Sequence, residues 1–148
     1  MARKETETEQ GCIVAYSWRQ FECEICKEAY PYVFKANGRK YRLIDEIEED
    51  LPADKSKPYL VLQSLTFEKN TNRMVQIIKP NLEAELSPGE HLQVFKMGRG
   101  HESEIRICDI SVSRCHTLVK YNRITGQFQL EDNLSKFGTL IHTKNDQI

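Results

Sequence analysis

From residue 59 onward, the chain consists of short runs of aliphatic and β-branched residues that are separated by turn-forming residues. The runs occupy residues 59–65, 74–78, 92–97, 104–107, 117–121, 127–130 and 138–141. Their spacing is close to the roughly 8–12 residues that separate successive strands in an antiparallel β-sandwich. The second run is closed by Pro80, which cannot continue a central strand. The sequence therefore predicts an all-β fold, and more specifically an antiparallel β-sandwich.

Charge and hydropathy exclude several classes of protein. The 148 residues include 21 Lys and Arg and 22 Asp and Glu, so bulk positive charge cannot drive nucleic-acid binding. The chain contains no apolar run of the roughly 18–20 residues that a membrane span needs, and no secretory signal. We therefore expect no nucleic-acid or membrane partner, reduced cysteines, and an intracellular location, cytoplasmic or nuclear.

Shifts in composition divide the chain into four parts. Residues 1–10 form a polar leader, residues 11–44 are rich in cysteine and aromatic side chains, residues 45–57 form an acidic linker, and the sandwich spans residues 58–148. Alternating runs within 32–44 flank Asn37 and Gly38, the pair most typical of a two-residue hairpin turn. Because few residues follow the last run, we expect the sandwich to lack its last strands. The hairpin is a candidate for the missing edge.

Three polar clusters fall at predicted strand ends. They are Gly98-Arg99, the stretch from Ser113 to His116, and residues 132–139. A sandwich gathers its loops at its ends, so the clusters could converge there. A guanidinium can grip two oxygens of a phosphate, a serine adds a neutral hydrogen bond, and a lysine adds a mobile charge. The sequence therefore predicts a small positive phosphate pocket, although each residue alone could be an ordinary solvated side chain.

The order Gly-Arg, Ser-x-x-His and Ser-x-x-Gly-Thr resembles the forkhead-associated (FHA) domain, a reader of phosphothreonine peptides, over residues 58–141. The resemblance implies two groups of residues. Peptide and phosphate contacts are expected from Arg99, Ser113, Arg114 and Lys136. Support of the binding loops is expected from Gly98, His116, Ser135, Gly138 and Thr139. His116 is expected to be a buried structural residue that braces the binding loop.

Phe137 departs from the family pattern. FHA domains usually carry an asparagine here, which holds the main chain of the ligand, and a phenyl ring cannot make those hydrogen bonds. Asn133 is a candidate replacement. Phe137 itself could be a hydrophobic contact for the ligand or part of the core.

Cys12, Cys23 and Cys26 follow the spacing C-x10-C-x2-C. With Trp18 between them, they resemble the tail of a RING-CH zinc finger, as found in some ubiquitin ligases, over residues 11–34. The resemblance implies zinc at these cysteines. No CxxC motif and no histidine precede Cys12, so this chain cannot build the complete two-zinc finger. The alternative is a truncated module with reduced thiols.

The leading hypothesis is a non-catalytic module that binds phosphothreonine-containing proteins without a required cofactor. One alternative is a fragment of a ubiquitin ligase, whose zinc module would recruit a ubiquitin-conjugating enzyme. Another is a structural scaffold with a degenerate phosphate pocket. An enzyme that uses Cys115 and His116 is disfavoured, because neighbouring residues in a strand point to opposite faces.

Overall fold

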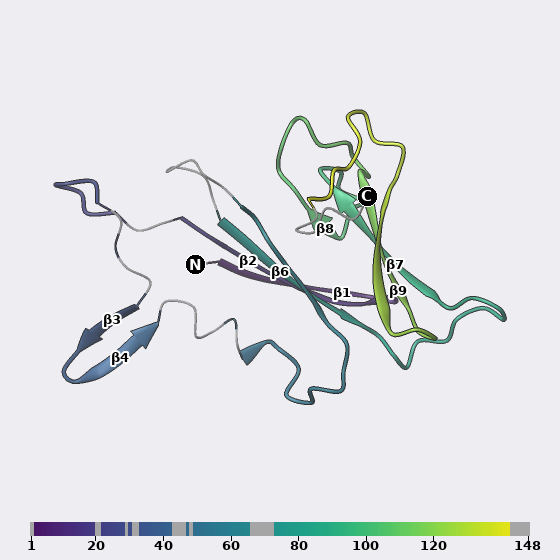
Figure 1. The fold of residues 1–148 in the computed structure, drawn as a ribbon, viewed down its shortest axis with the longest axis horizontal. Coiled ribbons are helices and arrows are strands. Elements are labelled where there is room, and N and C mark those ends of the chain that lie inside the picture. The colour runs from purple at the N-terminus through teal and green to yellow at the C-terminus, as the bar shows by residue number, and fades with distance from the viewer. Residues whose placement is uncertain are drawn as a thin grey trace. The chain divides into compact units, whose positions relative to one another are not determined.

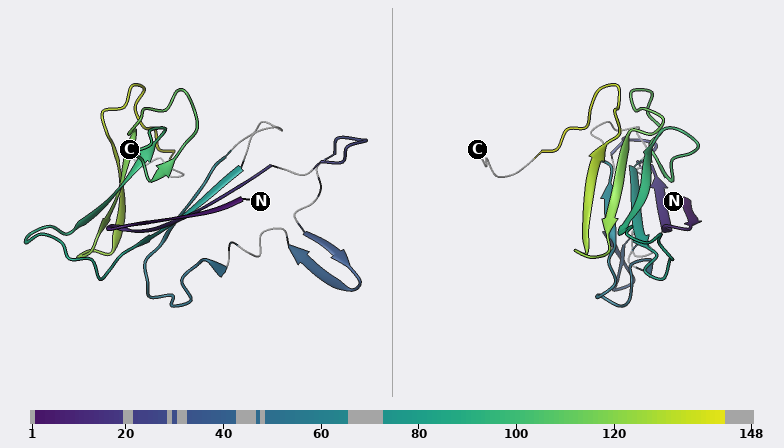
Figure 2. Two further views of the ribbon diagram at one scale, coloured as in Figure 1. Left: turned by 180° about the vertical axis from the view of Figure 1, so that it is seen from behind. Right: turned by 90° about the vertical axis from the view of Figure 1, so that its right-hand side faces the viewer.

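The computed structural model describes residues 2–19, 22–28, 30, 33–42, 47, 49–65 and 73–142. The elements that it defines in these residues are all β-strands (Figures 1 and 2). The chain divides into two compact units, Met1–Lys79 and Pro80–Ile148, which are described one at a time. No helix long and apolar enough to cross a membrane occurs in the described ranges.

The first unit contains a four-stranded sheet with the order β1-β2-β6-β5. Its strands are β1 (Ala2–Thr8), β2 (Gly11–Trp18), β5 (Leu60–Gln63) and β6 (Arg73–Pro80). The pairs β1–β2 and β5–β6 are antiparallel. The core of this unit is formed by β2 and β6, which contribute Val14, Tyr16, Val75 and Ile77.

The two polar segments of the first unit are more structured than the sequence suggested. Residues 2–8, expected to be a polar leader, form β1 and pair with β2 along its length. In the expected acidic linker, Leu51 packs against the core and Asp50 is bound to the sheet. The Arg3 guanidinium donates to both Asp50 carboxylate oxygens at 2.7 and 2.8 Å, and the Tyr16 hydroxyl also donates to Asp50.

The expected hairpin is confirmed by β3 (Val33–Ala36) and β4 (Arg39–Arg42), which pair antiparallel. Asn37 and Gly38 have φ angles of 51° and 74°. Positive φ at both central residues is the requirement of a type I′ turn, which asparagine and glycine meet best. The expectation that this hairpin completes an edge of the sandwich is wrong, because the two strands form a sheet of their own.

The second unit contains a four-stranded sheet with the order β10-β9-β7-β8. Its strands are β7 (Leu92–Gly98), β8 (Ile105–Arg106), β9 (Thr117–Asn122) and β10 (Gln127–Asp132). β9 pairs antiparallel with both β7 and β10, whereas the short β8 runs parallel to β7. Phe95, Ile105, Val119 and Tyr121 are buried.

The predicted fold class is confirmed: the elements of the described residues are strands in mainly antiparallel sheets, consistent with an FHA-like β-sandwich. One predicted strand is wrong, because residues 138–141 form no strand. Leu140 there is 97% exposed, and the Thr139 hydroxyl is held by Asp132. The last described residues instead leave the sheet as an extended segment (Figure 2).

Candidate functional site

The three predicted clusters all lie in loops of the second unit. Arg99 directly follows β7, Ser113 and Arg114 lie between β8 and β9, and Lys136 follows β10. The Arg99 N–H donates to the Ser113 carbonyl at 3.1 Å, and the Gly100 N–H donates to the Arg114 carbonyl at 2.9 Å. These bonds extend the edge of β7 into the loop and bring the first two clusters side by side.

Gly98 allows this close approach between the two backbones. A Cβ atom at residue 98 would lie 2.2 Å from the carbonyl oxygen of Arg114 and 2.7 Å from that of Ser113. Both contacts are far shorter than any that a side chain tolerates. Only glycine fits here, which agrees with the structural role that the resemblance implied.

The Ser113 hydroxyl joins the second cluster to the third. Its oxygen accepts the backbone N–H of Lys136 at 3.1 Å. Within the described ranges, no acceptor faces the hydroxyl hydrogen of Ser113. That hydrogen can therefore be donated outward, while the oxygen holds the Lys136 backbone in place.

The His116 side chain links the loop that contains Ser113 to the loop that follows β10. Its Nδ1 atom accepts the Ser113 N–H at 3.1 Å, and its Nε2 atom lies 3.2 Å from the Gly138 carbonyl oxygen. Because Nδ1 accepts and a carbonyl can only accept, these bonds assign the neutral tautomer with its proton on Nε2. His116 thus acts as a cross-link between loops, and its ring nitrogens are occupied.

The last loop is organised by Asp132, at the end of β10, which our sequence analysis did not assign to the site. Its carboxylate accepts the Ser135 hydroxyl at 2.6 Å, the Thr139 hydroxyl at 2.7 Å and the Ser135 N–H at 3.1 Å. These bonds, led by that from the Ser135 hydroxyl, lower the pKa of Asp132. The signal in the sequence was the Asp-x-x-Ser spacing, which is typical of an aspartate-capped turn.

Asn133 is engaged by the protein itself. Its backbone N–H donates to the His116 carbonyl at 2.8 Å, and its side-chain nitrogen donates to the Cys115 carbonyl at 3.2 Å. In this conformation, the amide nitrogen supports the loop before β9. The second hydrogen of that nitrogen and the amide oxygen have no partner among the described residues, so Asn133 could still contribute one donor and one acceptor to a ligand.

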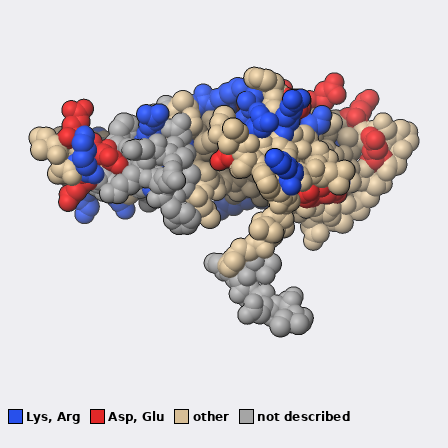
Figure 3. Space-filling model, turned by 90° about the horizontal axis from the view of Figure 1, so that it is seen from above, with Lys and Arg blue, Asp and Glu red and all other residues tan. Residues whose placement is uncertain are grey.

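Arg99, Arg114 and Lys136 all have exposed side chains. None of the described carboxylates forms an ion pair with these three cations. Figure 3 shows, in one view, exposed Lys and Arg side chains with Asp and Glu side chains beside them. The three loops that meet near the Ser113 hydroxyl therefore carry three exposed cations that form no ion pair with a described carboxylate.

Phe137 is 68% exposed, which excludes the interpretation that it belongs to the core. The Lys136 ammonium lies 5.1 Å from the centroid of its ring, within the range of a cation–π interaction. Phe137 therefore adjoins one of the three cations and presents an apolar surface to the solvent.

The cysteines of the first unit form a pair rather than a trio. Cys23 to Cys26 form a tight turn that ends at Lys27, which has a φ of 58°. Backbone N–H groups of Cys26 and Ile25 stabilise the Cys23 thiolate and lower its pKa to about 7. Cys12 lies instead on β2 and groups with Glu5 and Glu7, and burial raises its pKa to about 12.

Two thiols are the right type of ligand for a soft cation such as zinc, but they are too few to complete a zinc site. Thiolates are the preferred ligands of structural zinc, and a closed tetrahedral site needs four. Cys23 and Cys26 supply two, and the described part of the chain brings no third cysteine or histidine to them. The predicted set of three cysteines is therefore not assembled in these residues.

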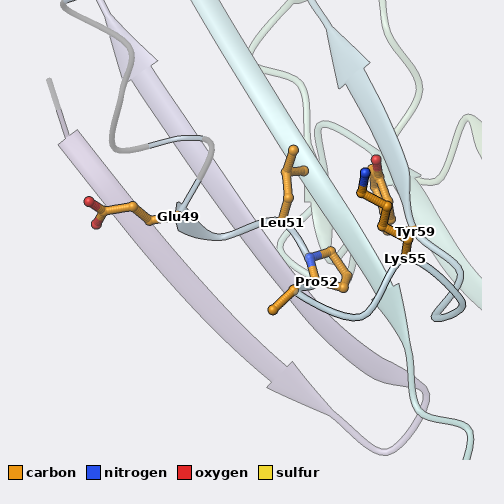
Figure 4. Close-up of a pocket in the computed structure, with 6 residues that line it drawn as sticks. Glu49, Leu51, Pro52, Lys55 and Tyr59 are labelled. Atoms are coloured by element: carbon orange, nitrogen blue, oxygen red, sulfur yellow. The ribbon is translucent and has the colours of Figure 1, made fainter.

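The first unit also contains a pocket of about 550 Å³ beside the segment that leads into β5. Leu51, Pro52 and Tyr59 supply its apolar wall, and Glu49 and Lys55 supply charged groups (Figure 4). No residue that the sequence predicted as functional lines this pocket.

The C-terminal part of the chain matches a known protein family. The model of the FHA domain matches residues 95–147, which include every predicted phosphate-binding residue. Comparisons with curated proteins and with solved structures gave no match. FHA domains are non-enzymatic modules that bind phosphorylated protein partners. The stretch from β7 to the C-terminal segment is therefore similar to the FHA domain.

Proposed function

We propose that the second unit binds phosphothreonine-containing peptides of partner proteins. The observation that carries the proposal is the Ser113 hydroxyl, whose oxygen is bonded to the Lys136 N–H and whose hydrogen has no acceptor within the described residues. Arg99, Arg114 and Lys136 lie on the loops that meet at this hydroxyl. The match to the FHA domain supports the same class of ligand.

A phosphate dianion suits this group of donors. The guanidinium groups of Arg99 and Arg114 can each donate two parallel hydrogen bonds, the Ser113 hydroxyl adds one, and Lys136 adds a mobile charge. The bonds of His116 and Asp132 already order the loops in the absence of a ligand. The loop backbones therefore lose little further conformational entropy on binding, which favours affinity.

The test is binding to an oriented phosphothreonine peptide library, followed by fluorescence anisotropy with single peptides. We expect binding that requires the phosphate, is weaker for phosphoserine, and is abolished by Arg99→Ala. Lys96→Ala is the matched control, since it removes an exposed positive charge from β7 near Arg99. If Arg99→Ala binds as well as the parent protein, the pocket lies elsewhere. If the folded parent binds no phosphopeptide, the scaffold alternative takes first place.

We also propose that Cys23 and Cys26 form half of a site for a thiophilic cation such as zinc. The turn that directs two N–H groups at the Cys23 thiol supports this, because thiolates rather than thiols bind metals. The test is zinc content after dialysis, measured by mass spectrometry. Cys23→Ser should lose the metal, and Cys108→Ser, at an exposed cysteine of the second unit, should keep it. Absence of zinc from the parent would contradict the proposal.

The ubiquitin-ligase alternative requires more than this pair of thiols. Recruitment of a ubiquitin-conjugating enzyme by a RING-CH finger depends on a complete zinc module, and the described residues offer two ligands for it. A pull-down with a conjugating enzyme, performed on zinc-loaded protein and on Cys23→Ser, would separate this role from simple metal binding.

A further inference from the structure

Large apolar side chains are concentrated on the candidate binding loops. In the described part of the second unit, six such side chains are at least two-thirds exposed, and five of them lie in the segments that follow β8 and β10. The five are Ile110, Leu134, Phe137, Leu140 and Ile141. The sixth, Ile124, lies in the turn between β9 and β10. Exposed apolar surface next to a functional loop is typical of a contact surface.

Phe137 directly follows the residue whose backbone is bonded to the Ser113 hydroxyl. The Lys136 N–H lies 3.1 Å from the Ser113 oxygen, and Phe137 is the next residue, with its Cα about 3.8 Å further along the chain. The Lys136 ammonium lies 5.1 Å from the Phe137 ring centroid. An anion held between Ser113 and Lys136 would therefore have this ring beside it.

We propose that Phe137 makes the second unit select phosphopeptides that carry a large apolar side chain close to the phosphorylated residue. This inference rests on the proposed function and names its partner class. A phenyl ring cannot hydrogen-bond the main chain of a peptide, so the ring contributes by removing apolar surface from water. The 68% exposure of Phe137 leaves most of the ring available for that contact.

The size of the preference follows from the area that can be buried. Covering about 55 Å² of apolar surface between the ring and a ligand side chain is worth, at roughly 25 cal/mol per Å², about a tenfold change in affinity. Phosphate contacts do not distinguish neighbouring residues of the peptide, so the apolar preference and the phosphate requirement should be separable by mutation.

The experiment compares four proteins on a library with fixed phosphothreonine and randomised flanking residues. The parent should enrich Leu, Ile, Met or Phe at one flanking position. Phe137→Ala should lose this enrichment and bind the preferred peptide about tenfold more weakly, while still requiring the phosphate. Phe137→Leu should retain the preference, because it keeps an apolar side chain. Ile124→Ala, at a side chain of equal exposure (69%) in the opposite turn, should behave as the parent.

The outcomes distinguish the role of Phe137 from the phosphopeptide-binding function itself. Phosphate-dependent binding by the parent without apolar enrichment, or enrichment that survives in folded Phe137→Ala, would overturn the role of Phe137 and leave the phosphopeptide function standing. Absence of phosphate-dependent binding in the folded parent would overturn both. If circular dichroism shows Phe137→Ala to be unfolded, Phe137→Thr supplies the same comparison with a polar side chain that suits a loop.

Discussion

Gly98→Ala is the substitution whose effect can be worked out most directly from the structure. The new Cβ would lie 2.2 Å from the carbonyl oxygen of Arg114, whereas ordinary van der Waals contacts begin at 3.4 Å. The segment from Ser113 to Arg114 must therefore retreat by about 1 Å to restore normal contact distances. That movement stretches two backbone hydrogen bonds, from Arg99 to Ser113 and from Gly100 to Arg114.

The free energy of unfolding should fall by a sum of these effects. Forcing an extra carbon into a packed site costs about 1–3 kcal/mol. Each weakened hydrogen bond costs about 0.5–1.5 kcal/mol. The total is about 2–6 kcal/mol. In a domain of 60–100 residues, each kcal/mol shifts the melting temperature by about 4–8 °C, so a loss of at least about 8 °C is expected.

The assay is thermal denaturation followed by circular dichroism, with phosphopeptide anisotropy below the transition. Gly126→Ala is the matched control: its φ is 68°, so alanine is strained there by about 1–2 kcal/mol, but no atom lies within 4 Å of the new Cβ. Gly98→Ala should melt below this control and lose phosphopeptide binding. A melting temperature equal to or above that of Gly126→Ala would refute the close approach that we infer at Gly98.

Three further substitutions probe the other contacts. Ser113→Ala should weaken phosphopeptide binding by about 1–3 kcal/mol in anisotropy titrations, and unchanged affinity would remove Ser113 from the site. His116→Ala should mainly lower the melting temperature, since it deletes two loop bonds; lost binding at unchanged stability would contradict its bracing role. Asp50→Asn should destabilise the first unit at neutral pH, because Arg3 lowers the pKa of Asp50 to about 2. That stabilisation is present above the unfolded pKa of about 4 and is lost as the pH falls towards 2. The melting temperatures of parent and variant should therefore converge in acid. A difference in melting temperature that stays constant with pH would contradict the role of the ion pair.

The strand Thr117–Asn122 was predicted from the sequence because one of its faces is buried. Thr117–Asn122 alternates between buried and half-buried residues, and its alternating pattern was visible in the sequence. β1 was missed because both of its faces are polar, so its pairing with β2 leaves no hydrophobic periodicity. Residues 138–141 gave the opposite error: their composition suits a strand, but Thr139 is bound to Asp132 and Leu140 faces solvent.

For the candidate site, the sequence predicted which residues meet but not how they are held. The convergence of Arg99 and Ser113 follows from the placement of loops at strand ends, which residue patterns reveal. The bond from the Lys136 N–H to the Ser113 hydroxyl depends on backbone positions and not on the identity of residue 136. The hydrogen bond from the Asn133 side-chain amide to the Cys115 carbonyl also depends on backbone positions, so the sequence could not predict it.

The structure separates the residues that hold the loops from the residues that face outward. Gly98, His116 and Asp132 make contacts within the protein, so their loss should appear first as a loss of stability. Arg99 and Arg114 form no ion pair with any described carboxylate. Keeping like charges on adjoining loops is unfavourable by itself, and a purely structural scaffold would gain nothing from it. A bound phosphate would remove that repulsion, which is why an anionic ligand accounts for this surface better than a structural role does.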